Sequence, residues 1–515
     1  MNSAAERELE IIAGLVSAES QTKELGLAPP QTSILRRRSA KLLLLLFLAT
    51  LPLVNPWVRG DGVGYYAYIR SMLVEHKLDF QNDWRAANLG FTLGKVHQDG
   101  AVDPSQFTPT GYLDNHFAVG PSILWAPFLV PVHVTLLALQ KLGMNVRPDG
   151  FSRPYIVTMA LATALYGFLG LWISFRLACR YVEERWALLA TLGIWFASSL
   201  PVYMYFNPSW SHAHSVFIVA VFLWYWHETR QGRTLRQWTI LGLISGLMLD
   251  VYYANIAVLA VPLLESIGQY WQGWRRPGHD WRSAGRLFVA NLVYCFAIVI
   301  AFLPTLITRQ IIYGHPLEFG YGGTDVWKWN APHLSSVLFS ADHGLLTWTP
   351  ILIPAVAGLF LFLRRERKLA AYLIAASLCF YYLIAIDPCW DGLSSFGNRK
   401  FVSLTPLFVL GLAVTFSEVS DLFKKSKGAV VVAASVTALL MVWNLGFIFQ
   451  WGTHLVPARG PISWKQMAYN QVAVVPARAV TDVKAYVGNR RGMMQRIELE
   501  DIGQQKKQQE ARRGQ

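Results

Sequence analysis

Isolated acidic side chains next to apolar segments could do chemistry at a membrane surface. Asp61 stands between glycines in the run GDGVGYY at 60–66, about three residues after the first apolar segment. Glycines permit a tight turn and close backbone approach, so one carboxylate can be held just outside the hydrocarbon, where it could act as a base. An interfacial turn with a solvated carboxylate would give the same pattern. Tyr65 and Tyr66 then begin a stretch with helical spacing.

Arg399 and Lys400 form a second kind of site, a pair of cations directly before an apolar segment. In the topology described below, both residues fall on the outer side of the membrane, where Arg and Lys are scarce. Binding of a lipid phosphate would explain them, because the Arg guanidinium matches phosphate oxygens in a bidentate way. Snorkelling of two long side chains to the interface is the alternative.

Other polar side chains near membrane depth are costly and therefore count as possible site residues. They are His116, His212, Asp250, Asp342 and His343, in addition to Tyr65 and Tyr66. Each also has a plain structural explanation: loop polarity, a buried histidine, a solvated hairpin tip or a helix cap. His212 and His214 are two residues apart, so on a helix they point to different faces and a paired zinc site is not expected.

The composition places these residues in a membrane protein. Of 515 residues, 53% are hydrophobic and only 15% are charged, whereas a soluble domain has about 25% charged residues. This excludes a disordered chain, a coiled coil and an ordinary cytosolic enzyme. The 20 Trp, 21 Tyr and 28 Phe suit membrane interfaces. The 4 cysteines form no C-x-x-C motif, so neither a disulfide framework nor a zinc site is indicated.

The hydropathy pattern predicts an all-α protein with about eleven transmembrane helices, each of roughly 20 residues. They lie at about 41–57, 155–175, 187–206, 213–227, 237–250, 253–269, 287–307, 346–363, 369–386, 403–417 and 429–449. The apolar stretch 117–139 contains Gly120, Pro121, Pro127 and Pro131. These residues are typical of a broken or re-entrant segment more than of a straight span.

The distribution of basic residues favours a re-entrant 117–139. If this segment enters and leaves on one side, the Arg and Lys clusters of six short loops, such as 36–38, 230–236 and 364–368, all face the cytoplasm. If the segment crosses, every later loop changes side and the rule is violated. The net charge of +14 is therefore largely topological, and a nucleic-acid partner is not expected.

This topology divides the chain into three parts. Residues 1–40 form a cytoplasmic tail, and 41–449 form the transmembrane domain, within which 58–154 is a long extracytoplasmic segment of juxtamembrane, amphipathic helices. Residues 450–515 form a tail that is expected outside, with a disordered end.

Four motifs, taken in order, resemble a known family. They are DGVGYY at 61–66, NHFAVGP at 115–121, LFSADHGL at 338–345 with WTP at 348–350, and SFGNRKF at 395–401. The chain is similar to membrane glycosyltransferases of the C superfamily, in particular to the bacterial branch that resembles protein O-mannosyltransferases and the lipid A aminoarabinose transferase. The resemblance covers roughly residues 40 to 450.

The resemblance implies an inverting sugar transfer from a polyprenyl-phosphate donor to a lipid, glycan or protein acceptor, in a bacterial inner membrane with the site facing the periplasm. Asp61 would be the catalytic base or a carboxylate beside a metal. Arg399, with Lys400, would hold the donor phosphate, and His116 would line the site. Relatives often have a second acidic residue where Gly62 stands, and many have a Lys or Arg near Asp250. These departures put metal dependence in question, and a divalent metal ion is the one cofactor that the resemblance leaves open.

Two other classes of protein fit the same residues. A transporter or lipid flippase would use Asp250 and the outer cations as substrate or proton sites, although no inverted repeat is evident in the sequence. A glycan polymerase or ligase would also use outer loops and lipid-linked donors. The sugar and the acceptor are not encoded by any motif.

Overall fold

The computed structural model describes residues 33–275, 281–320 and 326–513. Most of the predicted tail 1–40 therefore lies outside the described residues. Within them the regular structure is helical, with two isolated β-bridges, Val96 with Val102 and Phe107 with Leu113. The α-helices are α2 (Ser33–Thr50), α3 (Asp61–Val74), α4 (Gln81–Ala86), α5 (Leu89–Thr92), α6 (Gly120–Lys141), α7 (Arg153–Ala178), α8 (Glu184–Phe196), α9 (His212–Thr229), α10 (Leu235–Val251), α11 (Ala260–Arg275), α12 (Trp281–Tyr313), α13 (Leu334–Phe339), α14 (Leu345–Trp348), α15 (Leu352–Leu361), α16 (Arg367–Ile386), α17 (Thr405–Leu422), α18 (Lys427–Gly452), α19 (Trp464–Tyr469), α20 (Val475–Gly488) and α21 (Arg490–Arg513).

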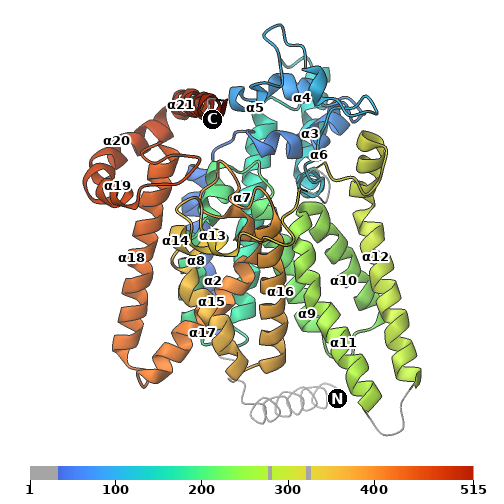
Figure 1. Ribbon diagram of the computed structural model, residues 1–515, viewed down its shortest axis with the longest axis vertical. Coiled ribbons are helices and arrows are strands. Elements are labelled where there is room, and N and C mark those ends of the chain that lie inside the picture. Colours follow the sequence, from blue (N-terminus) through green and yellow to red (C-terminus); the bar gives the residue numbers. More distant parts are fainter. Residues whose placement is uncertain (1–32, 276–280, 321–325, 514–515) are drawn as a thin grey trace, which may run out of the picture.

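Short 3-10 and π segments connect several of these helices. The 3-10 segments are η1 (Leu51–Leu53), η2 (Pro104–Gln106), η4 (Tyr253–Leu259), η5 (Phe362–Arg364) and η6 (Arg399–Leu404), and the π segments are η3 (Val202–Phe206) and η7 (Asn470–Val474). Figure 1 shows the long helices side by side, with α3 to α6 and α19 to α21 gathered at the upper end of the view.

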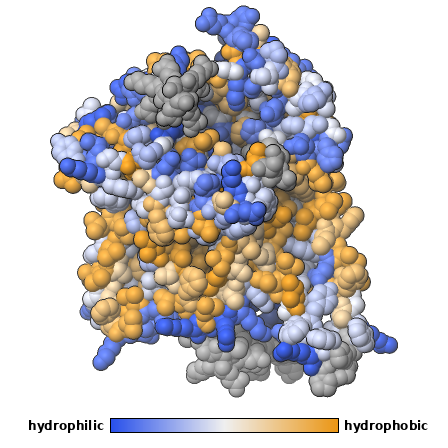
Figure 2. All heavy atoms as spheres, viewed as in Figure 1, coloured by the Kyte–Doolittle hydropathy of each residue, from blue (hydrophilic) through white to orange (hydrophobic). Residues whose placement is uncertain are grey.

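An apolar band crosses the middle of the molecule on the face drawn in Figure 2. Figure 2 shows hydrophobic residues across the central part of this face and hydrophilic residues above and below it. In the described part of the chain, six helices are long and apolar enough to cross a membrane: α6, α7, α12, α16, the continuous segment Arg399–Leu422 and α18. The chain is therefore an integral membrane protein with an all-helical fold.

The prediction of eleven spans is not confirmed by these lengths. Helices α8, α10 and α11 contain 13, 17 and 16 residues, and a straight span needs about 20. Apolar runs located the helices, but two predicted spans are each divided: 187–206 contains α8 and η3, and 253–269 contains η4 and the start of α11.

The long helices differ in how they use their apolar surface. In Arg399–Leu422, 83% of the most apolar window is buried inside the protein, whereas in α12 the figure is 17%. The first segment therefore forms the centre of the fold, while α12 presents its apolar side chains outward. Close packing around the centre depends on small residues: a Cβ atom on Gly358 of α15 would lie 1.8 Å from the carbonyl oxygen of Gly411 in α17.

Helix α6 corresponds to the stretch that was expected to be broken or re-entrant. It is one continuous helix of 22 residues, with Pro127 and Pro131 inside it, so the expected break is absent. The chain on both sides of α6 nevertheless contacts α3. Before α6, the Asn115 amide donates to the Gly64 carbonyl (3.0 Å), and after it the Gly150 carbonyl accepts from the Tyr66 hydroxyl (2.7 Å).

Helix α3 was expected to lie on the membrane surface with one apolar face. In the structure every residue from Gly62 to Ser71 is buried, so it is an internal helix. The reason lies in its small residues: a Cβ on Gly62 would lie 2.0 Å from the Ser209 hydroxyl oxygen, and one on Gly64 would lie 1.9 Å from the Phe117 ring. A hydrophobic pattern read only from large residues does not detect burial through glycine.

The C-terminal tail is helical. Helix α21 continues to Arg513, through the segment 504–509 for which the sequence predicts disorder. The tail returns to the end of the molecule that holds α3: Tyr486 of α20 donates to the Leu53 carbonyl (2.8 Å), and Arg59 pairs with Asp501 of α21 (3.0 Å).

The junction between α6 and α10 yields a stability prediction. A Cβ on Gly120 would lie 2.4 Å from the Asp250 carbonyl carbon, and backbone atoms cannot move aside as a flexible side chain would. Gly120→Ala should therefore lower the free energy of unfolding by about 1–3 kcal/mol. The measurement is the thermal unfolding midpoint of the purified protein in detergent.

Gly273→Ala in α11 is the matched control, because no atom lies within 4 Å of its Cβ position. It should leave the midpoint unchanged or raise it slightly. Equal midpoints for the two variants would contradict the packing described at Gly120.

Candidate functional site

An ion pair between Asp61 and Arg399 joins residues 338 positions apart in the chain. The Arg399 Nη2 atom donates to Asp61 Oδ2 at 2.7 Å. The Arg399 side chain is 12% exposed and that of Asp61 is 34% exposed. The guanidinium is thus fixed within the protein, while the carboxylate can be reached from solvent. Two residues predicted separately from the sequence therefore meet in one place.

Backbone geometry brings the carboxylate to this position. Gly60 has φ +54° and ψ −134°, a conformation that residues with a side chain rarely adopt. Asp61 is consequently the first residue of α3, where an acidic side chain is favourable next to the helix dipole. Arg399 is the first residue of η6, at the N-terminal end of the central apolar segment.

The Trp210 ring, in the turn before α9, packs on the Arg399 guanidinium. The Arg399 Cζ lies 4.1 Å from the centre of the Trp210 ring, a cation–π contact. The His212 ring packs edge-on against Tyr203, with 4.7 Å between ring centres, and is also close to Trp210, at 6.1 Å. The sequence predicted His212 as a possible site residue, and the structure places it beside Trp210, which the sequence did not indicate.

Tyr65 lies next to the ion pair on the first turn of α3. Burial and then the negative charge of Asp61 raise the pKa of Tyr65 far above its ordinary value, so the phenol stays neutral and can donate a hydrogen bond. Tyr66 has a different place: its hydroxyl donates to the Gly150 carbonyl (2.7 Å), so it ties α3 to the connection between α6 and α7.

A second cation, Lys95, lies in the segment between α5 and α6 and interacts electrostatically with Asp61. Its Nζ lies 4.0 Å from the centre of the Phe91 ring. Burial lowers the pKa of Lys95, and the charges of Asp61 and Asp114 act in the opposite direction. The ammonium therefore lies in the field of two carboxylates, in a position that short-range sequence patterns do not reveal.

His116 is grouped with Asp114 beside this lysine. The His116 Nδ1 lies 3.7 Å from Asp114 Oδ1, and the Tyr313 hydroxyl donates to the same carboxylate. Burial opposes ionisation of Asp114, but the nearby His116 ring, the hydrogen bond from Tyr313 and the charge of Lys95 prevail and lower its pKa. Asp114 is thus held as an anion, and the His116 ring lies beside it.

Asp342 and His343 lie on another side of the same region. His343 is fully buried with φ +60°, and its ring packs on Trp348 with 4.7 Å between centres. Burial, together with the positive charge of Arg399, lowers the pKa of His343 to about 3. Burial and the charge of Asp391 raise the pKa of Asp342 to about 6. Near neutral pH the histidine is neutral, whereas Asp342 titrates just below neutrality.

Lys400 turns away from the ion pair. Its Nζ donates to Asp387 Oδ2 (2.5 Å) and to the Cys389 carbonyl (2.6 Å), and the residue is 7% exposed. The two adjacent cations therefore have different surroundings: Arg399 faces Asp61, and Lys400 holds the loop that leads into η6.

Asp250 lies at the end of α10. It is fully buried, and its Oδ1 accepts from the Thr305 hydroxyl (2.5 Å) on α12. The sequence also allowed a solvated Asp250 at a hairpin tip, and the burial of its side chain excludes that alternative. Its contacts lead to α12 and to Gly120 and not to the Asp61–Arg399 pair.

The described residues do not fit a metal centre. Across 33–275, 281–320 and 326–513, no group of three or more His, Cys, Asp and Glu side chains is placed to hold a metal ion. Asp61 has Arg399 as its partner, and Gly62 supplies no second carboxylate beside it.

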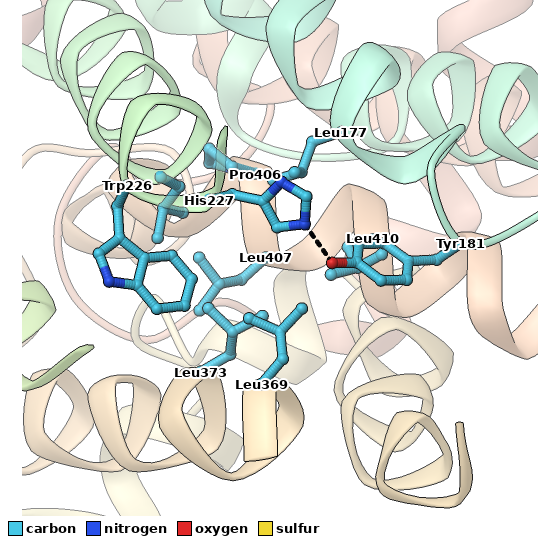
Figure 3. Close-up of a pocket in the computed structure, with 10 residues that line it drawn as sticks. Leu177, Tyr181, Trp226, His227, Leu369, Leu373, Pro406, Leu407 and Leu410 are labelled. Carbon is cyan, nitrogen blue, oxygen red and sulfur yellow. Dashed lines mark hydrogen bonds between the residues drawn. The ribbon is translucent and has the colours of Figure 1, made fainter. Parts of the chain in front are cut away.

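A small apolar cavity lies at the other end of α9. It is lined mainly by leucines, including Leu177 and Leu373, and the His227 ring is hydrogen-bonded to the Tyr181 hydroxyl beside it (Figure 3). His212 and His227 are separated by about 22 Å along the helix, at 1.5 Å per residue. The cavity is therefore remote from Asp61.

Comparisons with known proteins give similarities to solved membrane-protein structures. The archaeal oligosaccharyltransferase AglB from Archaeoglobus fulgidus, in complex with an inhibitory peptide and a dolichol-phosphate, has a TM-score of 0.47 at 13% identity, over 88% of this chain and 56% of that one. The apo form of the A. fulgidus oligosaccharyltransferase has a TM-score of 0.47 at 15% identity, over 81% and 58%.

ArnT from Cupriavidus metallidurans in the apo state has a TM-score of 0.46 at 14% identity, over 90% of this chain and 74% of that one. These proteins are glycosyltransferases of the C superfamily, the family that the sequence motifs resemble. The chain spans little more than half the length of the two oligosaccharyltransferase structures. No family model matches the sequence, and no curated protein matches it.

The raised pKa of Asp342 yields a pH prediction. An acid whose pKa is higher in the folded state binds its proton more tightly there, so Asp342 lowers stability as the pH rises from its ordinary value of 3.8 through about 6. Asp342→Asn cannot lose a proton. Between pH 4 and pH 7 the variant should therefore gain stability relative to the wild type, on the order of 2 kcal/mol.

The measurement is the unfolding midpoint of both proteins in detergent across this pH range. Asp99→Asn, in an exposed loop, is the control and should follow the wild type. Parallel pH profiles for wild type and Asp342→Asn would contradict the environment assigned to Asp342.

Proposed function

We propose that the protein is an integral-membrane glycosyltransferase that moves a sugar from a polyprenyl-phosphate carrier to an acceptor hydroxyl at the outer face of a bacterial inner membrane. The observation that carries this proposal is the Asp61–Arg399 pair, with 2.7 Å between Nη2 and Oδ2. It places a reachable carboxylate and a buried guanidinium together at the end of a bundle of apolar helices. A base and a phosphate-binding cation are the two groups that such a transfer needs.

The roles follow from charge and accessibility. Arg399 binds the donor phosphate, and Lys95 adds a second positive charge that interacts with Asp61. Asp61 accepts the proton of the acceptor hydroxyl, whose oxygen bonds to the anomeric carbon. The bond between that carbon and the phosphate oxygen breaks, and the electron pair remains on the lipid phosphate. Attack from the side opposite the phosphate inverts the anomeric configuration.

The pairing itself has a kinetic consequence. With no donor bound, Asp61 holds the guanidinium that the phosphate requires, so the donor must displace the carboxylate. Displacement releases Asp61 from its cation, which makes the carboxylate a better proton acceptor when the donor is in place. In this way the donor prepares the base for the acceptor.

A topology with a non-crossing α6 accords with this site. The segments before and after α6 contact Gly64 and Tyr66, two residues apart on α3. We therefore propose that the segment from Asn115 to Gly150, which contains α6, begins and ends at the end of the molecule that holds Asp61. On this basis 58–154 and the tail 450–515 are extracytoplasmic, and 41–449 form the transferase domain.

A transporter remains the second candidate, and Asp250 is the residue that it would use. This carboxylate is buried beside Thr305, away from the Asp61–Arg399 pair, which favours a structural role for it. A polymerase or ligase that takes lipid-linked donors would share the chemistry at Asp61 and differ in the acceptor.

Asp61→Asn tests the base. It keeps the shape of the side chain but removes the proton acceptor, so kcat should fall by roughly 10²- to 10⁴-fold. The variant also frees Arg399 from its anion, so the KM for the donor should fall. Arg399→Ala should instead raise the KM for the donor. Transfer is measured with purified protein and polyprenyl-phosphate sugars, with product detection by mass spectrometry.

Asp99→Asn is the control, because it makes the same change in an exposed loop. Full activity of Asp61→Asn would remove Asp61 from the mechanism. Movement of a substrate across liposomes without formation of a glycosidic bond would favour the transporter.

Labelling of a cysteine introduced after α6 tests the topology. Asn145 is exposed in the connection between α6 and α7. In a variant whose native cysteines are replaced by serine, Asn145→Cys should react with a membrane-impermeant maleimide in intact cells. Labelling only after the cells are opened would show that α6 crosses.

A further inference from the structure

Helix α21 packs on the segment that leads into Asp61. Arg490 Nη2 donates to the Pro52 carbonyl (2.6 Å), and Asp501 Oδ2 pairs with Arg59 Nη2 (3.0 Å). Residues near the C-terminus therefore hold both ends of the connection between α2 and α3. Figure 1 shows α21 close to α5 at the upper end of the molecule.

A chain of hydrogen bonds runs from α21 to the residue before Asp61. Glu498 Oε1 accepts from the Asn88 side-chain amide (2.8 Å) and from the Gly90 backbone amide (3.1 Å). Asn88 Oδ1 in turn accepts from the Gly60 backbone amide (3.1 Å). Glu498 is 8% exposed, so this acceptor is largely protected from water.

The chemistry of the groups fixes which of them donate and which accept in this series of hydrogen bonds. An ionised carboxylate can only accept hydrogen bonds, so Asn88 must turn its NH₂ group to Glu498. Its oxygen then has to face Gly60. The Gly60 amide belongs to a strained turn (φ +54°), and one acceptor holds it in place. The α21 carboxylate thereby sets the turn from which Asp61 projects.

A second connection lies parallel to the first. The His454 ring, at the end of α18, lies between Glu500 Oε2 (2.9 Å) and Asp501 Oδ1 (2.7 Å). Asp501 also contacts Arg59. Burial opposes protonation of His454, but its hydrogen bonds and the charges of these two carboxylates raise its pKa. Helix α21 is thus anchored to α18 on one side and to the Asp61 turn on the other.

We propose that Glu498 and Asn88 are positioning residues for Asp61, so that the docked α21 holds the turn at Gly60 in the geometry that proton transfer requires. The role in transfer depends on the glycosyltransferase activity proposed above, whereas the coupling of α21 to the turn does not. In this arrangement the C-terminal helix completes a site whose reacting groups lie elsewhere in the chain.

Exchanging the two functional groups tests the relay. Asn88→Asp places two carboxylates opposite each other and should lower kcat by roughly 10- to 100-fold, without the rise in donor KM that is expected of Arg399→Ala. Asn88→Asp combined with Glu498→Gln restores one donor and one acceptor in the reverse order, and should recover most of kcat. Leu499→Ala is the control, because this neighbour on α21 is 62% exposed, and it should behave as wild type.

Hydrogen–deuterium exchange of the same full-length proteins tests the coupling without activity. Peptides covering 57–66 should exchange faster in Asn88→Asp than in wild type, and the double variant should return toward the wild-type rate. Equal exchange and equal kcat in Asn88→Asp and Leu499→Ala would overturn the proposal, as would a double variant that recovers neither. If the wild type transfers no sugar while exchange follows the expected pattern, the proposed function fails and the coupling of α21 stands.

Discussion

The arrangement of the end of the molecule that holds α3 depends on the ion pair between Asp61 and Arg399. A carboxylate and a guanidinium at the end of an apolar bundle are costly when separated and unpaired. Their contact across 338 residues fixes the start of α3 against the start of the central segment Arg399–Leu422. Trp210 then packs on the guanidinium, and its indole donates to the Arg59 carbonyl (2.9 Å). One electrostatic contact therefore connects the N-terminal, middle and C-terminal parts of the chain.

The pair also differs from a fully buried salt bridge, because its carboxylate can be reached from solvent. Asp61 is 34% exposed, and Lys95 extends the positive field around it. An incoming phosphate would satisfy the cations and release the carboxylate. In contrast, Arg70 is buried and pairs with two carboxylates, Asp83 (2.5 Å) and Glu75 (2.6 Å). The two arginines therefore differ in the accessibility of their carboxylate partners: Asp61 is 34% exposed, whereas Asp83 is 3% exposed.

The sequence predicted the helical, membrane-embedded class because apolar runs and the lack of charge are properties of whole segments. It also named Asp61 and Arg399, since each breaks a local rule: an acid among glycines and a cation on the outer side. It could not place Lys95 or Asn88, because their roles arise only from contacts between distant segments. The sequence indicated Lys400 because it follows Arg399, but in the structure Lys400 pairs with Asp387. The burial of α3 was missed because glycine contributes little to a hydrophobic pattern.

A structure of the protein with bound polyprenyl phosphate, determined by electron cryomicroscopy in a lipid nanodisc, tests the central claim most directly. We expect a phosphate oxygen within hydrogen-bond distance of the Arg399 guanidinium and the Asp61 carboxylate displaced from it. A phosphate bound elsewhere, with the Asp61–Arg399 pair intact, would contradict this account.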